Sequence, residues 1–278
     1  MTSSRTPGIA AWHASIPELV HDIGTTGFYA ILDKRLRNLV YFDLSCIFVY
    51  RDDSMPRFIH DGLKNVLSPD IMENYLNGTY LFDAVYDACC RKVPQGLYRL
   101  KQLAPDDFFQ GDYYNSPEFH PCISMETGTL SEEIVFLVPV GEVYLAYSLL
   151  RQRLQPAFCA AEFELLTEVS LMVTAMLSKH WRHSCEEESK LANLEERNAA
   201  HIGRAFETFA TGIITSREQA IVSMILRGHS SLSTAQSLGI SEGTVKNHRK
   251  NIYAKLRISS QTELFRTFIE HLFKNNHG

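Results

Sequence analysis

Residues 215–268, TSREQAIVSMILRGHSSLSTAQSLGISEGTVKNHRKNIYAKLRISSQTELFRTF, decide the fold of the C-terminal part of this chain. Apolar residues recur there at helical spacing on both sides of a short turn at 238–241. Gly239 can take a positive φ at little cost, which suits a sharp turn, and the Ser241 hydroxyl can cap the next helix. We therefore predict short helices around one small core, in helix-turn-helix order.

The helix after this turn carries the residues that predict contact with DNA. Lys246, Asn247 and Lys250 share one helical face, while Val245 and Ile252 point inward. Asparagine can form two hydrogen bonds with adenine, and lysine can reach the acceptors of guanine. The residues predicted to contact bases or phosphates are Thr244, Lys246, Asn247, His248, Arg249, Lys250 and Lys255.

Charge is divided unevenly along the chain, and the division favours nucleic acid as a partner of the C-terminal part. The whole chain has 27 Lys+Arg against 32 Asp+Glu, a net charge of −5. Residues 211–278 hold nine Lys+Arg and four Asp+Glu, so this part carries +5 and the remainder carries −10. A basic module attached to an acidic body is typical of a DNA-binding unit, because its cations displace the counterions of phosphates.

A known family shares this pattern. The matching residues are Thr215, Arg217, Glu218, Gly228, Ser230, Ala235, Leu238, Gly239, Ile240, Ser241, Thr244, Val245, Lys246, His248, Asn251, Ile252, Lys255, Leu256, Glu263 and Leu264. With them the segment resembles the LuxR-type helix-turn-helix, a four-helix module of transcription factors. The resemblance implies that Glu218 ties the helices together. Leu232 and Thr234 depart from the family, which usually has Lys and Ile at these positions.

The body, about residues 8–181, mixes helices and strands. Predicted helices lie at 10–23, 28–39, 68–77 and 158–181, and predicted strands lie at 44–50, 57–60, 122–130, 132–139 and 143–151. The strands do not alternate regularly with helices, which favours an antiparallel sheet flanked by helices. We expect an α+β sensor domain of the PAS or GAF type, followed by an all-α four-helix LuxR-type module.

The length of 278 residues suggests about two domains. We expect a sensor and dimerisation domain at 1–183, a helical linker at 184–210 and the DNA-binding domain at 211–278. The linker carries a partial apolar stripe. It is expected to be a dimer helix, a helix packed on the DNA-binding domain, or a solvated connection. For dimerisation, the helix at 158–181 is the better candidate.

An aromatic run marks the candidate ligand site of the body. Residues 75–86, YLNGTYLFDAVY, gather aromatic rings around one acid, Asp83. Rings and carboxylates together suit a small amine or another polar cation, although such a stripe also suits an ordinary core. The predicted ligand-binding residues are Tyr75, Tyr80, Phe82, Asp83, Tyr113, Tyr114 and Glu132.

The same run is similar to the pocket segment of LuxR-type autoinducer receptors. In that family, aromatic residues and an Asp hold an acyl-homoserine lactone. This chain departs from the pattern, because Ile71 stands where the family has Trp and Ala84 follows Asp83 in place of Pro. An acyl-homoserine-lactone-responsive regulator is therefore the alternative reading of the sensor.

A closer resemblance covers more of the body. The runs GLYRL at 96–100, LAPDDFF at 103–109 and FLVP at 136–139 are similar to a group of LuxR-type regulators with a non-autoinducer sensor domain. The resemblance implies a sensor without naming its ligand. A body controlled by a protein partner, with no small ligand, is a further alternative.

These patterns predict a one-component transcriptional regulator. Operator DNA, a small-molecule effector and a second copy of the chain are the expected partners, and RNA polymerase is a candidate. Catalytic motifs and zinc-ligand spacing are absent from the sequence, so we expect no enzymatic activity, metal or cofactor. The N-terminus does not resemble a signal peptide, and no apolar run reaches membrane-spanning length, so a cytoplasmic location is predicted.

Overall fold

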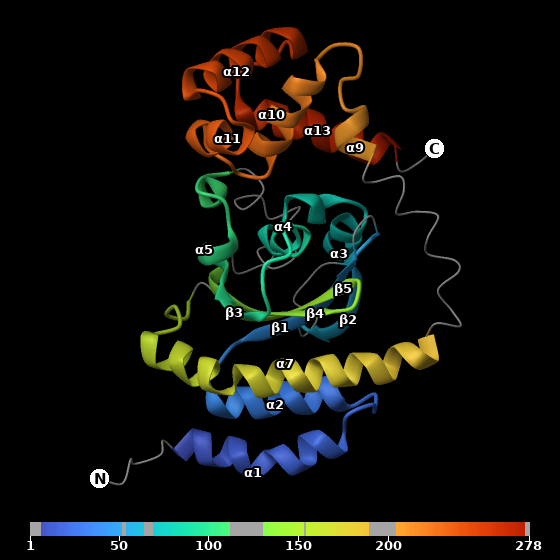
Figure 1. Ribbon diagram of the computed structural model, residues 1–278, viewed down its shortest axis with the longest axis vertical. Helices are drawn as coiled ribbons and strands as arrows, with labels where there is room; N and C mark the ends of the chain where they lie inside the picture. The colour runs from blue at the N-terminus through green and yellow to red at the C-terminus, as the bar shows by residue number, and fades with distance from the viewer. Residues whose placement is uncertain are drawn as a thin grey trace.

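The computed structural model describes residues 7–51, 54–63, 69–111, 130–152, 154–188 and 204–275 (Figure 1). We call residues 7–188 the body and residues 204–275 the C-terminal module. The helices of the body are α1 (Pro7–His21), α2 (Phe28–Leu39), α3 (Pro69–Leu76), η1 (Thr79–Phe82), α4 (Ala84–Cys90), α5 (Leu100–Leu103), η2 (Phe108–Gln110) and α7 (Ala160–Glu188). Its strands are β1 (Leu44–Arg51), β2 (Arg57–Gly62), β3 (Gly96–Arg99), β4 (Leu130–Val140) and β5 (Val143–Gln152).

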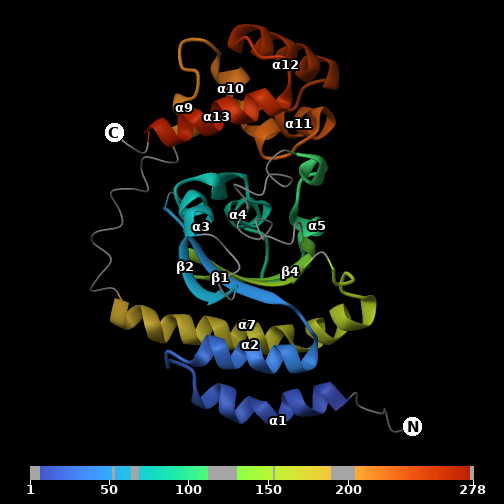
Figure 2. The same cartoon turned by 180° about the vertical axis from the view of Figure 1, so that it is seen from behind.

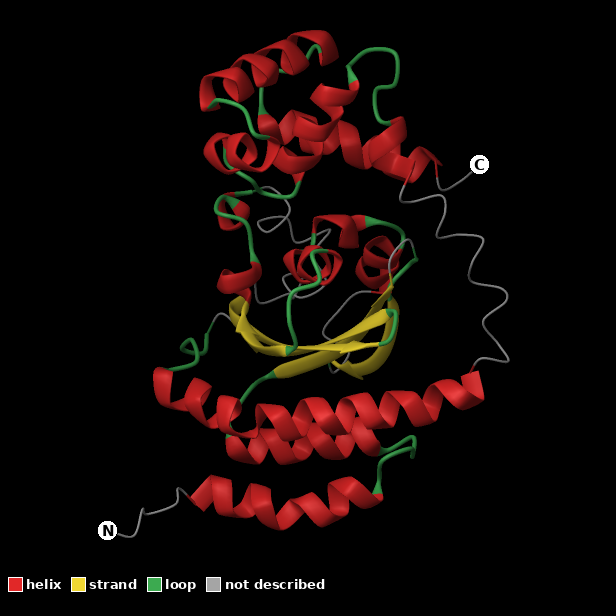
Figure 3. Cartoon of the chain, viewed as in Figure 1, coloured by secondary structure: helices red, strands yellow, loops and turns green. Residues whose placement is uncertain are grey.

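The body is layered around its sheet (Figure 3). Helices α2 and α7 lie against one face, with α1 outside them, and α3 and α4 lie on the other face. The C-terminal module sits on the α3–α4 side, so it lies on the opposite side of the body from α7, as the view from behind also shows (Figure 2).

The sheet is antiparallel, and within the described residues its strand order is β2-β1-β5-β4-β3. Strand β1 is apolar on both faces, because both faces are covered by helices. Cys46, Phe48 and Tyr50 join the core under α3 and α4, whereas Ile47 and Val49 join the core under α7. This alternation along the strand divides the body into two hydrophobic cores.

The predicted fold class is confirmed, and the predicted helices and most of the strands are found near their expected bounds. The predicted strand at 122–130 lies almost wholly outside the described residues. The short elements of residues 79–110 were missed, namely η1, α4, the edge strand β3, α5 and η2. Each is too short to show a clear period in the sequence, and β3 is held by pairing with β4 alone.

The C-terminal module consists of α9 (Arg204–Thr208), α10 (Ser216–Leu226), α11 (Ser231–Leu238), α12 (Glu242–Leu256) and α13 (Gln261–Asn275). Hydroxyl side chains cap three of these helices, because Thr215, Ser230 and Ser241 each accept a hydrogen bond from a backbone amide of the first turn. Gly239 ends α11 with a φ of 64°, and this confirms the positive φ predicted for the turn. The helix-turn-helix is therefore formed by α11 and α12.

The predicted linker at 184–210 divides between its neighbours. Its first residues, 184–188, continue α7. Its last residues belong to the C-terminal module, because α9 contacts α10 and α13, and Phe209 packs on Phe268 with ring centroids 5.1 Å apart. Residues 189–203, between these two parts, lie outside the described residues. Across the described ranges, none of the helices is long and apolar enough to span a membrane.

Candidate functional site

Helix α12 presents the predicted base-reading residues to solvent. Lys246, Asn247 and Lys250 are exposed, and Val245 and Ile252 are completely buried on the opposite side. The core contacts of the two buried residues fix the rotation of the helix, so the exposed row cannot turn inward. A helix with lysine and asparagine side chains exposed along one face can enter a major groove and contact base edges.

Several of the predicted DNA contacts, Lys246 among them, also interact within the module. Lys246 forms an exposed ion pair with Glu242 at 2.7 Å, which base contact would have to break. The Thr244 hydroxyl lies 2.7 Å from the capping hydroxyl of Ser241. Arg249 donates to Gln261 at 3.0 Å and to Ser231 at 3.3 Å, so its guanidinium also holds α12 to α11. His248 is half-buried.

Lys255 has a structural partner. Its Nζ donates to both carboxylate oxygens of Glu218, at 2.9 and 2.7 Å, and Glu218 is buried. Burial alone would raise the pKa of this carboxyl, but the hydrogen bonds from Lys255 and Thr215 outweigh it and lower the pKa. Lys255 therefore joins α12 to the start of α10, a role that its sequence position did not distinguish from phosphate contact.

A polar cluster lies in the core between the sheet and α3, η1 and α4. The Tyr75 hydroxyl donates to Asp83 at 2.7 Å and lies 2.6 Å from the Tyr50 hydroxyl. The other carboxylate oxygen of Asp83 accepts from the Val85 amide at 2.8 Å, which caps α4. Burial raises the pKa of Asp83. We call Tyr50, Tyr75, Asp83 and Glu133 the acid cluster.

Neighbouring glutamates on β4 face opposite cores. Glu133 faces the α4 side, where it accepts from Ser148 at 2.6 Å, and burial together with the charge of Asp83 raises its pKa to about 8. Glu132 faces the α7 side, where it pairs with Arg99 and accepts from the Phe158 amide at 2.8 Å. The structure thus separates Glu132 from Tyr75 and Asp83 and places Glu133 on their side of the sheet, because side chains alternate along a strand.

The remaining predicted ligand residues divide into three groups. Tyr80 packs edge to face on Tyr86, with ring centroids 4.8 Å apart, beside the acid cluster. Phe82 turns away and packs on Phe265 and Phe268 of the C-terminal module, at 5.3 and 5.5 Å between centroids. Tyr113 and Tyr114 lie outside the described residues.

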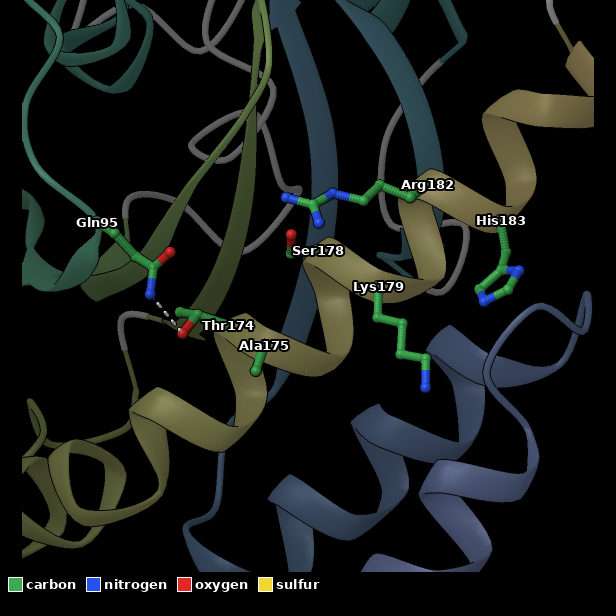
Figure 4. Close-up of a pocket in the computed structure, with 7 residues that line it drawn as sticks. All are labelled: Gln95, Thr174, Ala175, Ser178, Lys179, Arg182 and His183. Carbon is green, nitrogen blue, oxygen red and sulfur yellow. Dashed lines mark hydrogen bonds between the residues drawn. The ribbon is translucent and has the colours of Figure 1, made fainter.

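A small cavity and a larger groove lie in the described parts of the body. A cavity of about 130 Å³ opens beside Tyr50, Tyr86 and Tyr144, at the rim of the acid cluster. A groove of about 590 Å³ lies along α7, where the Gln95 amide donates to the Thr174 hydroxyl at 3.0 Å (Figure 4). This groove contains none of the predicted ligand residues. Tyr50 is the member of the acid cluster that lines the smaller cavity, and the carboxyl groups of Asp83 and Glu133 are buried behind it.

The helix-turn-helix matches the family model described as bacterial regulatory proteins, luxR family, over residues 213–268. An HTH-type transcriptional regulator described from the exeN 3' region of Aeromonas salmonicida is 30% identical over 197 residues, covering 68% of this chain and 94% of that protein. The chain belongs to the LuxR family of DNA-binding transcriptional regulators.

Two further comparisons each cover only part of the chain. The response regulator protein TodT of Pseudomonas putida is 39% identical over 77 residues, but this covers only 28% of the chain and 33% of TodT. The crystal structure of the VqsR LBD domain from Pseudomonas aeruginosa covers 62% of this chain and 98% of its own, with 25% identity and a TM-score of 0.52. The body therefore shares its fold with a domain of that type.

Proposed function

We propose that this protein is a cytoplasmic one-component regulator that binds a small polar or cationic molecule in its body and operator DNA through α12. The observation that supports the proposal is that η1 and α4 contact both the acid cluster and the C-terminal module. Asp83, between them, belongs to the acid cluster, while the adjacent Phe82 packs on the C-terminal module. A ligand that moves Asp83 would also change the contact between Phe82 and the module. The ligand would then bind the two arrangements of body and module with different affinity, which regulation requires.

The DNA site is tested by removing one base-reading side chain at a time. Lys246→Ala and Asn247→Ala are each expected to weaken binding to a selected duplex by about 1–3 kcal/mol, or roughly 5- to 150-fold. The duplex is first selected from a random-sequence pool by the full chain, and affinity is measured by fluorescence anisotropy. Lys274→Ala removes the same charge from the far end of α13 and should change affinity less than about twofold. Equal losses in all three variants would mean that α12 does not read bases.

The ligand site is tested by thermal melting of the full chain against a library of small amines and acyl-homoserine lactones. An amine is expected to raise the melting temperature with concentration, because it binds the folded state alone. Asp83→Asn should remove the shift, since the amide lacks the charge that pairs with the ligand. A shift from lactones alone would support the alternative ligand, and no shift from any compound would favour control by a protein partner.

A second copy is proposed to bind along the outer face of α7. Leu171 and Met172 are 77% and 42% exposed on this helix, and the acidic Glu164 and Glu168 precede them while Arg182 follows. Two such helices packed antiparallel about a two-fold axis would place each acidic half against the basic half of the other copy and bury the apolar centre. Paired modules would in turn gain affinity for paired half-sites.

Leu171→Glu is expected to raise the dissociation constant of the dimer by at least about tenfold, because it buries a charge at the centre of the interface. Sedimentation velocity of the full chain at micromolar concentration measures this change. Leu154→Glu is the matched control, since Leu154 is 88% exposed but lies before α7. A wild-type chain that stays monomeric, with and without DNA, would rule out this interface.

A further inference from the structure

The loop that follows α5 contacts the C-terminal module at the start of its helix-turn-helix. Both carboxylate oxygens of Asp106 are engaged by Ser230, one by the backbone amide at 3.1 Å and one by the hydroxyl at 2.5 Å. The next residue, Asp107, donates its backbone amide to the Gly228 carbonyl at 3.0 Å. These hydrogen bonds join residues that are more than a hundred positions apart in the sequence.

Shape and apolar packing support the same contact. Gly228 has a φ of +88°, and a Cβ atom there would lie 2.6 Å from the Cα of Phe108, so the loop and the module touch backbone to backbone. Beside this point Arg227 lies 3.6 Å from Asp87 of α4. The buried residues under α4 and those of the module also form one continuous hydrophobic cluster, in which Phe82 is completely enclosed.

The Asp106 contact lies where we expect the DNA backbone to bind. Ser230 caps α11, and in a helix-turn-helix the first helix crosses the DNA backbone. The free amides and the positive end of the dipole at a helix N-terminus are suited to a phosphate. Ser231, the next residue, accepts a hydrogen bond at 3.3 Å from Arg249 of α12, so the start of α11 adjoins the DNA-reading helix.

We propose that the Asp106 carboxylate occupies the position of a DNA phosphate at the start of α11, so that docking of the C-terminal module on the body and tight binding of DNA compete. A carboxylate with two oxygens on an amide and a hydroxyl reproduces the charge and the hydrogen bonding of a phosphate. The docked state is then a low-affinity state, and its population reduces the apparent affinity for DNA.

This inference rests on the proposed DNA-binding function and adds the regulation of that site. The docking contacts lie on either side of Asp83 in the sequence. Phe82 and Asp87 both contact the module, while Asp83 between them belongs to the acid cluster. An effector that shifts α4 would release the module and expose the start of α11 to DNA.

The test compares two neighbouring acids. Asp106→Ala is expected to bind the selected duplex about three- to tenfold more tightly than the wild-type full chain, because it removes the competitor. Asp107→Ala removes the same charge one residue away, where the side chain makes none of the described hydrogen bonds to the module. It is expected to change affinity less than about twofold, which separates competition from general charge repulsion.

Hydrogen exchange supplies a second measurement on the full chain. Peptides covering 104–111 and 227–234 are expected to be protected in the free protein, and the 104–111 peptide should lose protection when the duplex binds. Equal affinities of the two alanine variants, or unchanged exchange at 104–111 in the complex, would overturn the inference while leaving DNA binding intact. Failure of the full chain and of both variants to select any duplex would instead overturn the proposed function, and the inference with it.

Discussion

Glu133→Gln is expected to make the full chain more stable at pH 8 by about 2–4 kcal/mol, and to leave its stability near pH 4 almost unchanged. Glu133 is buried on the α4 side of β4, and its pKa is raised from 4.5 to about 8 by burial first and by Asp83 second. The folded chain therefore binds this proton more tightly than the unfolded chain does. The stability that the protonated Glu133 carboxyl contributes is fully present below pH 4.5. It decreases as the pH rises from 4.5 and is lost once the pH has passed about 8.

Urea unfolding at several pH values measures this effect. Between the unfolded and folded pKa values the wild type should lose up to about 1.4 kcal/mol for each pH unit from this residue alone, and the Gln variant should lack that slope. Glu132→Gln is the matched control, because the adjacent Glu132 is paired with Arg99 on the other face. Glu132→Gln should lower the free energy of unfolding at pH 8, whereas Glu133→Gln should raise it. A change of the same sign in both variants would contradict the assigned burial of Glu133.

Glu218→Ala is expected to destabilise the C-terminal module by about 2–4 kcal/mol, because it leaves Lys255 without its carboxylate and the start of α10 without its capping box. Lys255 is partly exposed, with 39% of its side chain accessible, which keeps the cost below that of a fully buried pair. Since α10 and α12 are joined through this pair, α12 should lose its support as well.

Native-state hydrogen exchange of amides in α10 and α12 measures that loss within the full chain. Glu242→Ala is a suitable control, because it removes an exposed pair with Lys246 on the first turns of α12 and should cost less than about 0.5 kcal/mol. Equal effects of the two substitutions would show that the Glu218 pair does not stabilise the module.

The helix-turn-helix could be predicted from the sequence because its signals are local. Hydroxyl caps, a glycine in the turn and apolar spacing act over a few residues, and each is found where it was expected, as Ser241 and Gly239 show. The rotation of α12 also followed from its sequence, since Val245 and Ile252 had to face the core. That the exposed row reads DNA bases remains a prediction until it is tested.

The candidate ligand site could be predicted only in part from the sequence. The run at 75–86 identified Tyr75, Tyr80 and Asp83, which the structure places together, because they lie close in sequence on connected short helices. The choice between Glu132 and Glu133 depends on the register of β4 against its neighbours, which a single residue's shift would reverse. Tyr50 could have been found from the alternation along β1, where it shares a face with Cys46 and Phe48.

The sequence by itself determined that this protein has a helix-turn-helix module joined to an α+β body, because both follow from periodicity, capping residues and charge within short segments. The LuxR type of that module came from the resemblance of residues 215–268 to the family. Only the tertiary structure decided that Lys255 supports α10, that Glu133 joins the acid cluster, and that Asp106 contacts Ser230 at the start of α11. The physical reason is that each of these depends on packing between segments distant in the chain, where many pairings satisfy the same local preferences and only the assembled core selects one.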